Sequence, residues 1–157
     1  MPATIPDLWS DDIRVDVLTP LAILRTQASL LSSKTRGLLI AELLTTTTST
    51  KQWIQYQLDI VAVPLKHYRV SILTARHRID EVYPVTVHSR AFGHEPEYEE
   101  AGKREATTEE EFITLLRFVL RSGLVRSLIQ SLIVRVNEVQ PNHFPHEDGT
   151  PCSDEEI

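Results

Sequence analysis

The stretch from Trp53 to Val87 constrains the fold more than any other part of this chain of 157 residues. Apolar and polar residues alternate along it, which is the period of a strand with one buried face. One side of its first half carries Ile54, Tyr56, Leu58, Ile60 and Ala62, and the other carries Gln55, Gln57 and Asp59. The alternation resumes at Tyr68 and returns at 82–87. The pattern therefore predicts two antiparallel strands followed by a third.

The connection between the first two strands is constrained by which side chains it pairs. A three-residue loop at 65–67 sets Ile60 opposite Ile72, whereas a two-residue loop sets Ile60 opposite Ser71. A slip of one residue turns every side chain to the other face. The three-residue loop is therefore favoured, although the usual Asn-Gly or Asp-Gly hairpin signal is missing.

Helical spacing precedes this stretch. Thr19 and Pro20 supply a hydroxyl for the N-cap and a proline for the first helical position. We expect the helix to run to about residue 36 and to end at Gly37. Before it, the alternation at 13–17 suggests a short strand. After it, residues 38–48 fit either a continued helix or a strand, and the threonine run 45–48 favours an exposed or edge strand.

A second helical region follows the stretch. Thr107 and Thr108 each have a glutamate three residues later, which is the capping-box spacing. Ser122 and Gly123 then interrupt a long run of helical spacing, whose part at 132–136 has a strand as its weaker alternative. The predicted fold is α+β: an antiparallel sheet of four to five strands, with one N-terminal helix and one or two C-terminal helices packed on one face as a two-layer sandwich.

Charge divides the chain into a body and two acidic segments. The net charge of −6 is distributed unevenly. Residues 94–111 hold eight acids and two bases, residues 138–157 hold six acids and no base, and the remainder holds fourteen bases and eight acids. We expect a single domain at 1–139 with a mobile acidic loop at 93–107, and a disordered acidic tail at 140–157. The strand at 82–87 contains Pro84, which predicts an edge strand or a strand that begins at the proline.

The bulk features exclude some classes of protein. No apolar run approaches the ~18–20 residues of a membrane helix. Asp7, Asp11 and Asp12 stand where a signal peptide carries positive charge, and the single Cys152 cannot form an internal disulfide. We therefore expect a cytoplasmic protein with no membrane partner, and the negative net charge disfavours nucleic acid.

Motifs for catalysis and cofactor binding are missing from the sequence. The five isolated glycines make no phosphate loop, and no nucleophile elbow or His-Glu-x-x-His pair occurs. In the tail, His143, His146, Asp148 and Cys152 include zinc-ligand types, but their proline-rich setting favours a solvated tail. No catalytic residue, metal site or cofactor is predicted.

Basic and aromatic side chains cluster along the central strands. The candidate ligand-binding residues are Tyr56, Tyr68, Arg69, Arg76, His77 and Arg78. Strand alternation places Arg76 and Arg78 on one face and His77 on the other. The cluster fits a site for a phosphate, a carboxylate or an acidic protein segment. A solvated outer face, satisfied by the acidic loop 94–111, is the competing interpretation.

Two functions from different classes follow. The first is a non-enzymatic protein-interaction or regulatory domain that self-associates, because exposed strand edges pair with other chains. Its partner is another protein chain or a second copy. The alternative is a small anionic-ligand binding domain, or an enzyme, that uses a cavity between sheet and helices. Nucleic-acid binding through the basic body ranks third.

Overall fold

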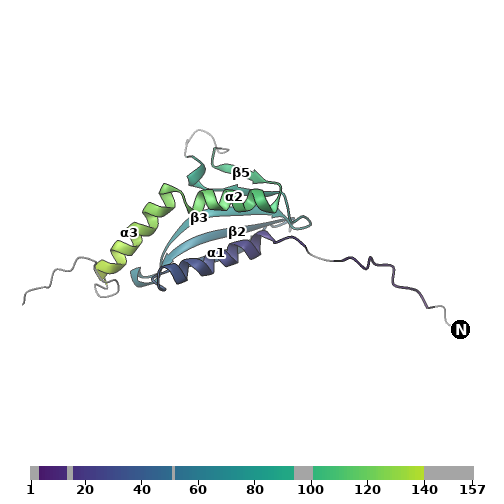
Figure 1. Cartoon of the computed structure of the whole chain (residues 1–157), viewed down its shortest axis with the longest axis horizontal. Coiled ribbons are helices and arrows are strands. Elements are labelled where there is room, and N and C mark those ends of the chain that lie inside the picture. Colours follow the sequence, from purple (N-terminus) through teal and green to yellow (C-terminus); the bar gives the residue numbers. More distant parts are fainter. Residues whose placement is uncertain (1–3, 14–15, 51, 94–100, 140–157) are drawn as a thin grey trace, which may run out of the picture.

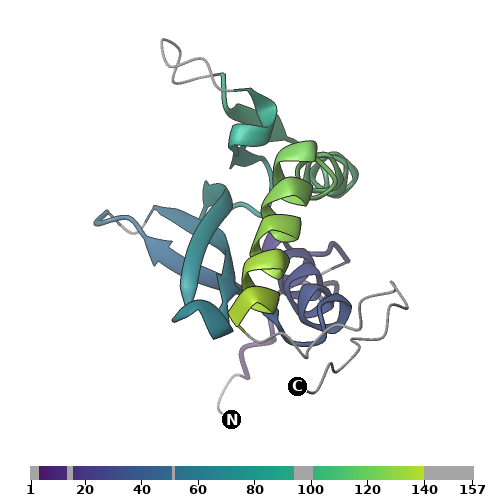
Figure 2. The ribbon, with the colours of Figure 1, turned by 90° about the vertical axis from the view of Figure 1, so that its left-hand side faces the viewer.

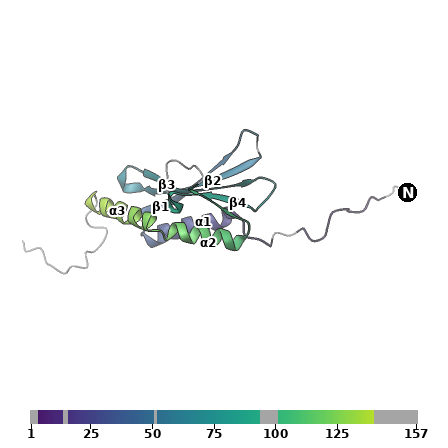
Figure 3. The ribbon, with the colours of Figure 1, turned by 90° about the horizontal axis from the view of Figure 1, so that it is seen from above.

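The computed structural model describes residues 4–13, 16–50, 52–93 and 101–139. Five strands form one antiparallel sheet in the order β1-β2-β3-β4-β5. One N-terminal and two C-terminal helices lie on one face of it, so the predicted α+β sandwich is confirmed (Figures 1 and 3). The elements in chain order are α1 Pro20–Lys34, β1 Leu39–Thr47, β2 Trp53–Ala62, η1 Val63–Leu65, β3 Tyr68–Arg78, β4 Val85–His88, η2 Arg90–Phe92, β5 Lys103–Ala106, α2 Glu109–Leu120 and α3 Gly123–Val139.

The core lies between the sheet and the helix layer. Each helix and each long strand contributes fully buried apolar side chains, including Leu24 of α1, Leu58 and Ile60 of β2, Phe112 of α2 and Val136 of α3. Figure 2 shows α3 crossing beside α1 and α2 over the same side of the sheet. This burial fixes which face of each strand points inward, and therefore which face is left without a helix.

The helix ends follow the sequence signals. The Thr19 side chain accepts a hydrogen bond from Ala22 N at 3.2 Å, with Pro20 in the first turn. The chain leaves α1 through Arg36 and Gly37, both with positive φ. Residues 39–47 then form a strand at the edge of the sheet, as the threonine run favoured.

The start of α2 forms a variant of the predicted capping box. The Thr108 side chain accepts from Glu111 N at 3.2 Å, while the Glu111 carboxylate accepts from Thr107 N at 2.7 Å and from its hydroxyl at 2.8 Å. These bonds, the backbone one first, lower the pKa of Glu111 below its ordinary value of 4.5. Ser122 separates α2 from α3 and accepts from Val125 N, so the predicted interruption is also present. The strand alternative at 132–136 was wrong.

The β2–β3 connection differs from the prediction. Ile60 lies opposite Val70 rather than Ile72, so the favoured register was wrong by two residues, although at this pair it kept the correct face. Pro64 lies in the short η1 turn, and Lys66 and His67 follow with positive φ. The connection therefore spans residues 63–67 and is longer than the predicted three-residue loop.

A β-bulge interrupts the β2–β3 ladder. Asp59 lies opposite Ser71, and the next residue of β2, Leu58, lies opposite Leu73, so Ile72 is an extra residue. A bulge changes the parity of the strand beyond it. The buried Ser89 side chain donates a 2.8 Å hydrogen bond to the carbonyl oxygen of Ile72. The backbone acceptor at the extra residue therefore has a partner.

The remaining differences concern edges and loops. β4 lies between β3 and β5, so the edge alternative was wrong, and the strand begins directly after Pro84, within one residue of the other alternative. Residues 103–106, predicted to belong to a mobile loop, form β5 because they pair with β4. Of the strand expected at 13–17, the described residues Ile13, Asp16 and Val17 form none.

Some expectations fall on residues that the structure does not describe. The tail at 140–157, with its histidines and cysteine, lies outside the described residues, as do residues 14–15 and 94–100. Within the described chain, no helix has the length and apolar character needed to cross a membrane.

Removing the Ser89 hydroxyl tests the bulge. Ser89→Ala leaves the Ile72 carbonyl buried without its donor, so we expect the free energy of unfolding to fall by about 1–3 kcal/mol. Urea titration measures the change. Ser71→Ala, at an exposed position beside the bulge, is the control and should change stability by less than about 0.5 kcal/mol. Equal effects of the two substitutions would contradict the assigned role.

The Glu111 carboxylate should make stability depend on pH. Because folding lowers its pKa, it contributes stability above pH 4.5 that is lost as the pH falls through the folded-state pKa. We therefore expect wild type to exceed Glu111→Gln in stability at neutral pH, with a difference that shrinks in acid. Urea titrations from neutral to acidic pH measure this. Glu110→Gln, in the same turn, is the matched control. A difference that does not vary with pH would refute the prediction.

Candidate functional site

The face of the sheet opposite the helices is largely polar. The pairing of β2 with its neighbours places Trp53, Gln55, Gln57 and Asp59 on this outer face. Across from them stand Arg69, Arg76 and Arg78 of β3. No described helix lies on this side of the sheet (Figure 3). The three arginines that the sequence singled out therefore share the outer face, with Arg76 and Arg78 toward one end and Arg69, opposite Val61, toward the other.

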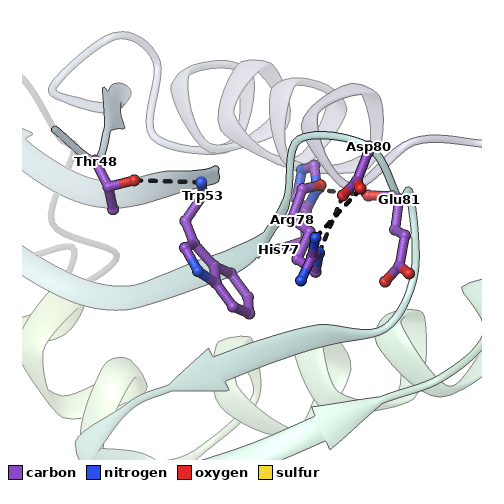
Figure 4. Close-up of polar contacts among 6 residues, drawn as sticks. All are labelled: Thr48, Trp53, His77, Arg78, Asp80 and Glu81. Atoms are coloured by element: carbon purple, nitrogen blue, oxygen red, sulfur yellow. Dashed lines mark hydrogen bonds and ion pairs between the residues drawn. The ribbon is translucent and has the colours of Figure 1, made fainter. Parts of the chain in front are cut away.

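Trp53 and two arginines form a cation–aromatic cluster at one end of this face. The guanidinium carbon of Arg76 lies 4.5 Å from the centroid of the Trp53 ring, and that of Arg78 lies 6.0 Å from it. Both distances are within the range of cation–π attraction. Arg78 also donates to Asp80 at 3.1 and 3.3 Å, which raises the pKa of Arg78 and lowers that of Asp80 (Figure 4). We call Trp53, Arg76 and Arg78 the outer-face patch.

Arg76 is the member of the patch whose charge has no internal acid. Among the described residues, its guanidinium forms no hydrogen bond or ion pair, and the side chain is exposed. Stacking on an aromatic ring uses the face of the guanidinium and leaves its in-plane N–H groups available. Arg76 is thus a preoriented donor for a planar anion such as a carboxylate.

Arg69 is used internally. It donates to Asp59 at 3.0 Å and also pairs with Glu42, while Gln57 donates to Asp59 at 2.9 Å. The hydrogen bonds to Asp59 and then to Glu42 raise the pKa of Arg69. Asp59 is 0% exposed, and a buried carboxylate requires such partners. Arg69 therefore satisfies a buried acid rather than presenting a free charge.

His77 faces the helices, and its contacts explain its presence there. Nδ1 lies 2.7 Å from the carbonyl oxygen of Arg78 and 2.9 Å from that of Glu81 (Figure 4). Carbonyl oxygens only accept, so Nδ1 carries the proton. In the neutral ring Nε2 then accepts from the Tyr56 hydroxyl at 3.3 Å. His77 ties the end of β3 to the turn that follows it.

The two tyrosines complete the predicted set on different surfaces. Burial raises the pKa of the Tyr56 hydroxyl, with a smaller lowering by Arg25, so it remains a donor at neutral pH. Tyr68 begins β3 and is exposed. The structure thus brings Tyr56 and His77 together on the inner side and Arg76 and Arg78 together on the outer side. The six residues do not surround one cavity.

The acidic segment 94–111 was the expected internal partner of the basic cluster. In its described part, 101–111, no acid forms an ion pair with the three arginines. Glu105 does reach the outer face, opposite Thr86 of β4. Among the described residues, no group of three or more acids, histidines or cysteines is arranged to hold a metal ion.

Trp53 is the patch residue that was not among the six candidates predicted from the sequence. The sequence did contain a sign of its outer-face position, namely its place in the alternation of polar and apolar residues. Trp53 lies two residues before Gln55 and four before Gln57, on the polar side of the alternation. A residue at that parity shares the outer face.

Comparisons with known proteins add no further information: no family model, curated protein or solved structure matches this chain. Its function therefore has to be argued from residue geometry.

His77→Ala tests the structural role of the imidazole. It removes the donor of two carbonyl oxygens and the partner of the Tyr56 hydroxyl, and we expect a loss of about 1–3 kcal/mol in the free energy of unfolding. Chemical denaturation measures it. His88→Ala, an exposed histidine on β4, should change stability by less than about 0.5 kcal/mol. If His77→Ala left the free energy of unfolding unchanged, the structural role assigned to His77 would be wrong.

Proposed function

We propose that this chain is a non-enzymatic protein-interaction domain that binds a short acidic segment of a partner polypeptide at the outer-face patch. The observation that supports this most directly is the Arg76 guanidinium, 4.5 Å from the Trp53 ring and free of any acid among the described residues. Arginine and tryptophan are the residue types that dominate the energy of protein interfaces.

The chemistry of the patch favours a carboxylate ligand. Arg76 offers a flat pair of N–H donors, which matches a carboxylate in a bidentate geometry. Arg78 adds positive charge while Asp80 holds its side chain in place. The Trp53 ring supplies apolar contact area beside the charges, which suits a peptide better than an isolated ion.

A polypeptide partner is favoured over nucleic acid. The outer face also carries Glu42 and Asp59, which pair with Arg69, and Glu105 in the same cross-strand row as Arg76, so acids interrupt its positive charge. A nucleic-acid backbone needs a continuous basic track because every nucleotide brings a phosphate. The small-ligand alternative receives less support, since the six candidate residues split between two faces and none of them lines the cavity between α1 and α2.

Binding of a fluorescein-labelled polyglutamate peptide tests the proposal. We expect saturable anisotropy at low salt with the full chain, and about a tenfold or greater loss of affinity in Arg76→Ala, because a charge-assisted hydrogen bond is worth about 1.5–3 kcal/mol. Arg76→Lys keeps the charge but loses the planar fork and should fall between the two. Arg135→Ala, an exposed arginine of α3, is the matched control.

The outcomes separate the candidate ligands. A thermal-shift response to citrate or phosphate that is lost in Arg76→Ala, without peptide binding, would replace the protein partner with a small anion. Tighter binding to single-stranded oligothymidine with a steep salt dependence would favour nucleic acid. No binding to any of these probes would reject the patch as a site.

A further inference from the structure

A groove separates α1 from α2 in the helix layer. It has a volume of about 400 Å³ and is lined by Leu18, Ala22, Ile23, Thr26 and Gln27 on one side and by Ile113, Leu116, Arg117, Leu120 and Arg121 on the other. Apolar side chains such as Ile23 and Leu116 form its floor and are buried. Two exposed arginines stand along its α2 rim. The groove thus combines an apolar floor with a positively charged border.

Arg117 and Arg121 have no acidic partner in the described part of the chain. Neither guanidinium takes part in an ion pair or hydrogen bond there. Their spacing of four residues places both on the same side of α2. Two adjacent charges of one sign without a counter-charge repel each other, so an acidic ligand along this rim would be favoured.

The described N-terminal arm, residues 4–13, has the complementary composition. It holds Asp7, Asp11 and Asp12 and no basic residue. The same segment carries four large apolar side chains that are almost fully accessible: Ile5 at 81%, Leu8 at 82%, Trp9 at 80% and Ile13 at 73% exposure. Scattered apolar side chains on a surface are normal, but a run of them on one short segment marks an interaction site. The composition of the arm is therefore suited to binding an apolar groove with a basic rim.

The start of α1 directs the arm away from its own groove. The backbone N–H of Leu18 donates to Glu109 at 3.1 Å, and its carbonyl oxygen accepts from the Tyr83 hydroxyl at 3.0 Å. Thr19 is extended, as expected for a residue before proline. Figure 1 shows the arm running outward from the body, beyond the start of α1. No residue of the arm lines the groove of its own chain.

We propose that the arm of one molecule docks into the α1/α2 groove of a second copy, so that two chains exchange arms and form a symmetric dimer. Leu8 and Trp9 enter the apolar floor, and Asp11 and Asp12 lie along the rim formed by Arg117 and Arg121. The exchange is reciprocal, which doubles each contact and closes the assembly at two chains. A buried aromatic side chain removes about 150–250 Å² from water, so Trp9 is the main anchor.

This dimer is independent of peptide binding at the outer-face patch. The groove lies in the helix layer, on the other side of the sheet from Trp53 and Arg76. The patch can fail as a binding site without affecting the dimer, and the reverse also holds.

Analytical ultracentrifugation of the full chain over a wide range of concentrations tests the exchange. We expect a monomer–dimer equilibrium that is weakened at least about tenfold by Trp9→Ala and by the double substitution R117E/R121E. The double substitution D11R/D12R should weaken it similarly. Mixing the two charge-reversed proteins should restore a heterodimer through both arms, because the basic arm meets the acidic groove and the acidic arm meets the basic groove. R76E/R78E, with the same charge change on the outer face, is the matched control and should leave the dimer unchanged.

Cross-linking distinguishes exchange from folding back. With Cys152→Ser as background, Ser10→Cys on the arm and Gln27→Cys on the groove rim should form a disulfide between two chains on oxidation, seen as a dimer in a denaturing gel. Circular dichroism confirms that each variant is folded. A monomer at every concentration, a dimer that ignores R117E/R121E, or a disulfide within one chain would each overturn the proposal.

Discussion

The fold depends on the bulge at Ile72. In the first part of β3, Val70 faces the helices opposite Ile60; beyond the bulge, Ala75 and His77 do so. Without the extra residue, the register that pairs Asp59 with Ser71 would place Arg76 opposite Ile54 and turn its charge into the core. The inserted residue thus lets both halves of β3 turn apolar side chains toward the helices, although the two halves alternate out of phase with each other. Ser89 stabilises this arrangement because it provides a donor for the Ile72 carbonyl.

The same bulge sorts the charged and aromatic side chains by role. Arg69 lies before it and reaches back to Asp59, so its charge compensates a buried acid. Arg76 and Arg78 lie beyond it and face the same side as the Trp53 ring, and Arg78 also pairs with Asp80. His77 is directed inward to Tyr56 and the following turn. One strand therefore supplies a structural ion pair, a structural histidine and an accessible cationic pair.

Local signals in the sequence were sufficient for the ends of the helices and for the antiparallel pair β2 and β3, and they favoured a strand at β1. Thr19-Pro20, Gly37, the Thr108–Glu111 spacing and Ser122 each act through backbone groups within one turn, so a short window contains the whole interaction. The strand pairing beyond β3 depends on residues far apart in sequence. Local pattern could not show that 103–106 would join β4 and make it an interior strand.

The candidate site was predicted in part for the same reason. Alternation placed Arg76 and Arg78 together and His77 apart, which the burial confirms. It could not show that Arg69 is occupied by Asp59, because that contact crosses two strands whose register the bulge shifts. The apolar pair Ile72-Leu73, which breaks the alternation, was the available sign of the bulge. Read together with the parity of Trp53, it would have given the outer-face patch.

The two candidate surfaces have different physical origins and lie on opposite sides of the sheet. The outer-face patch exists because a sheet covered on one face leaves polar residues on the other, and there one arginine is held by an aromatic ring. The groove lies between α1 and α2, whose starts are joined by the hydrogen bond from Leu18 N to Glu109. A dimer joined through the grooves would keep both patches accessible. Two linked patches bind a partner with repeated acidic segments more tightly than one, because the second contact becomes intramolecular.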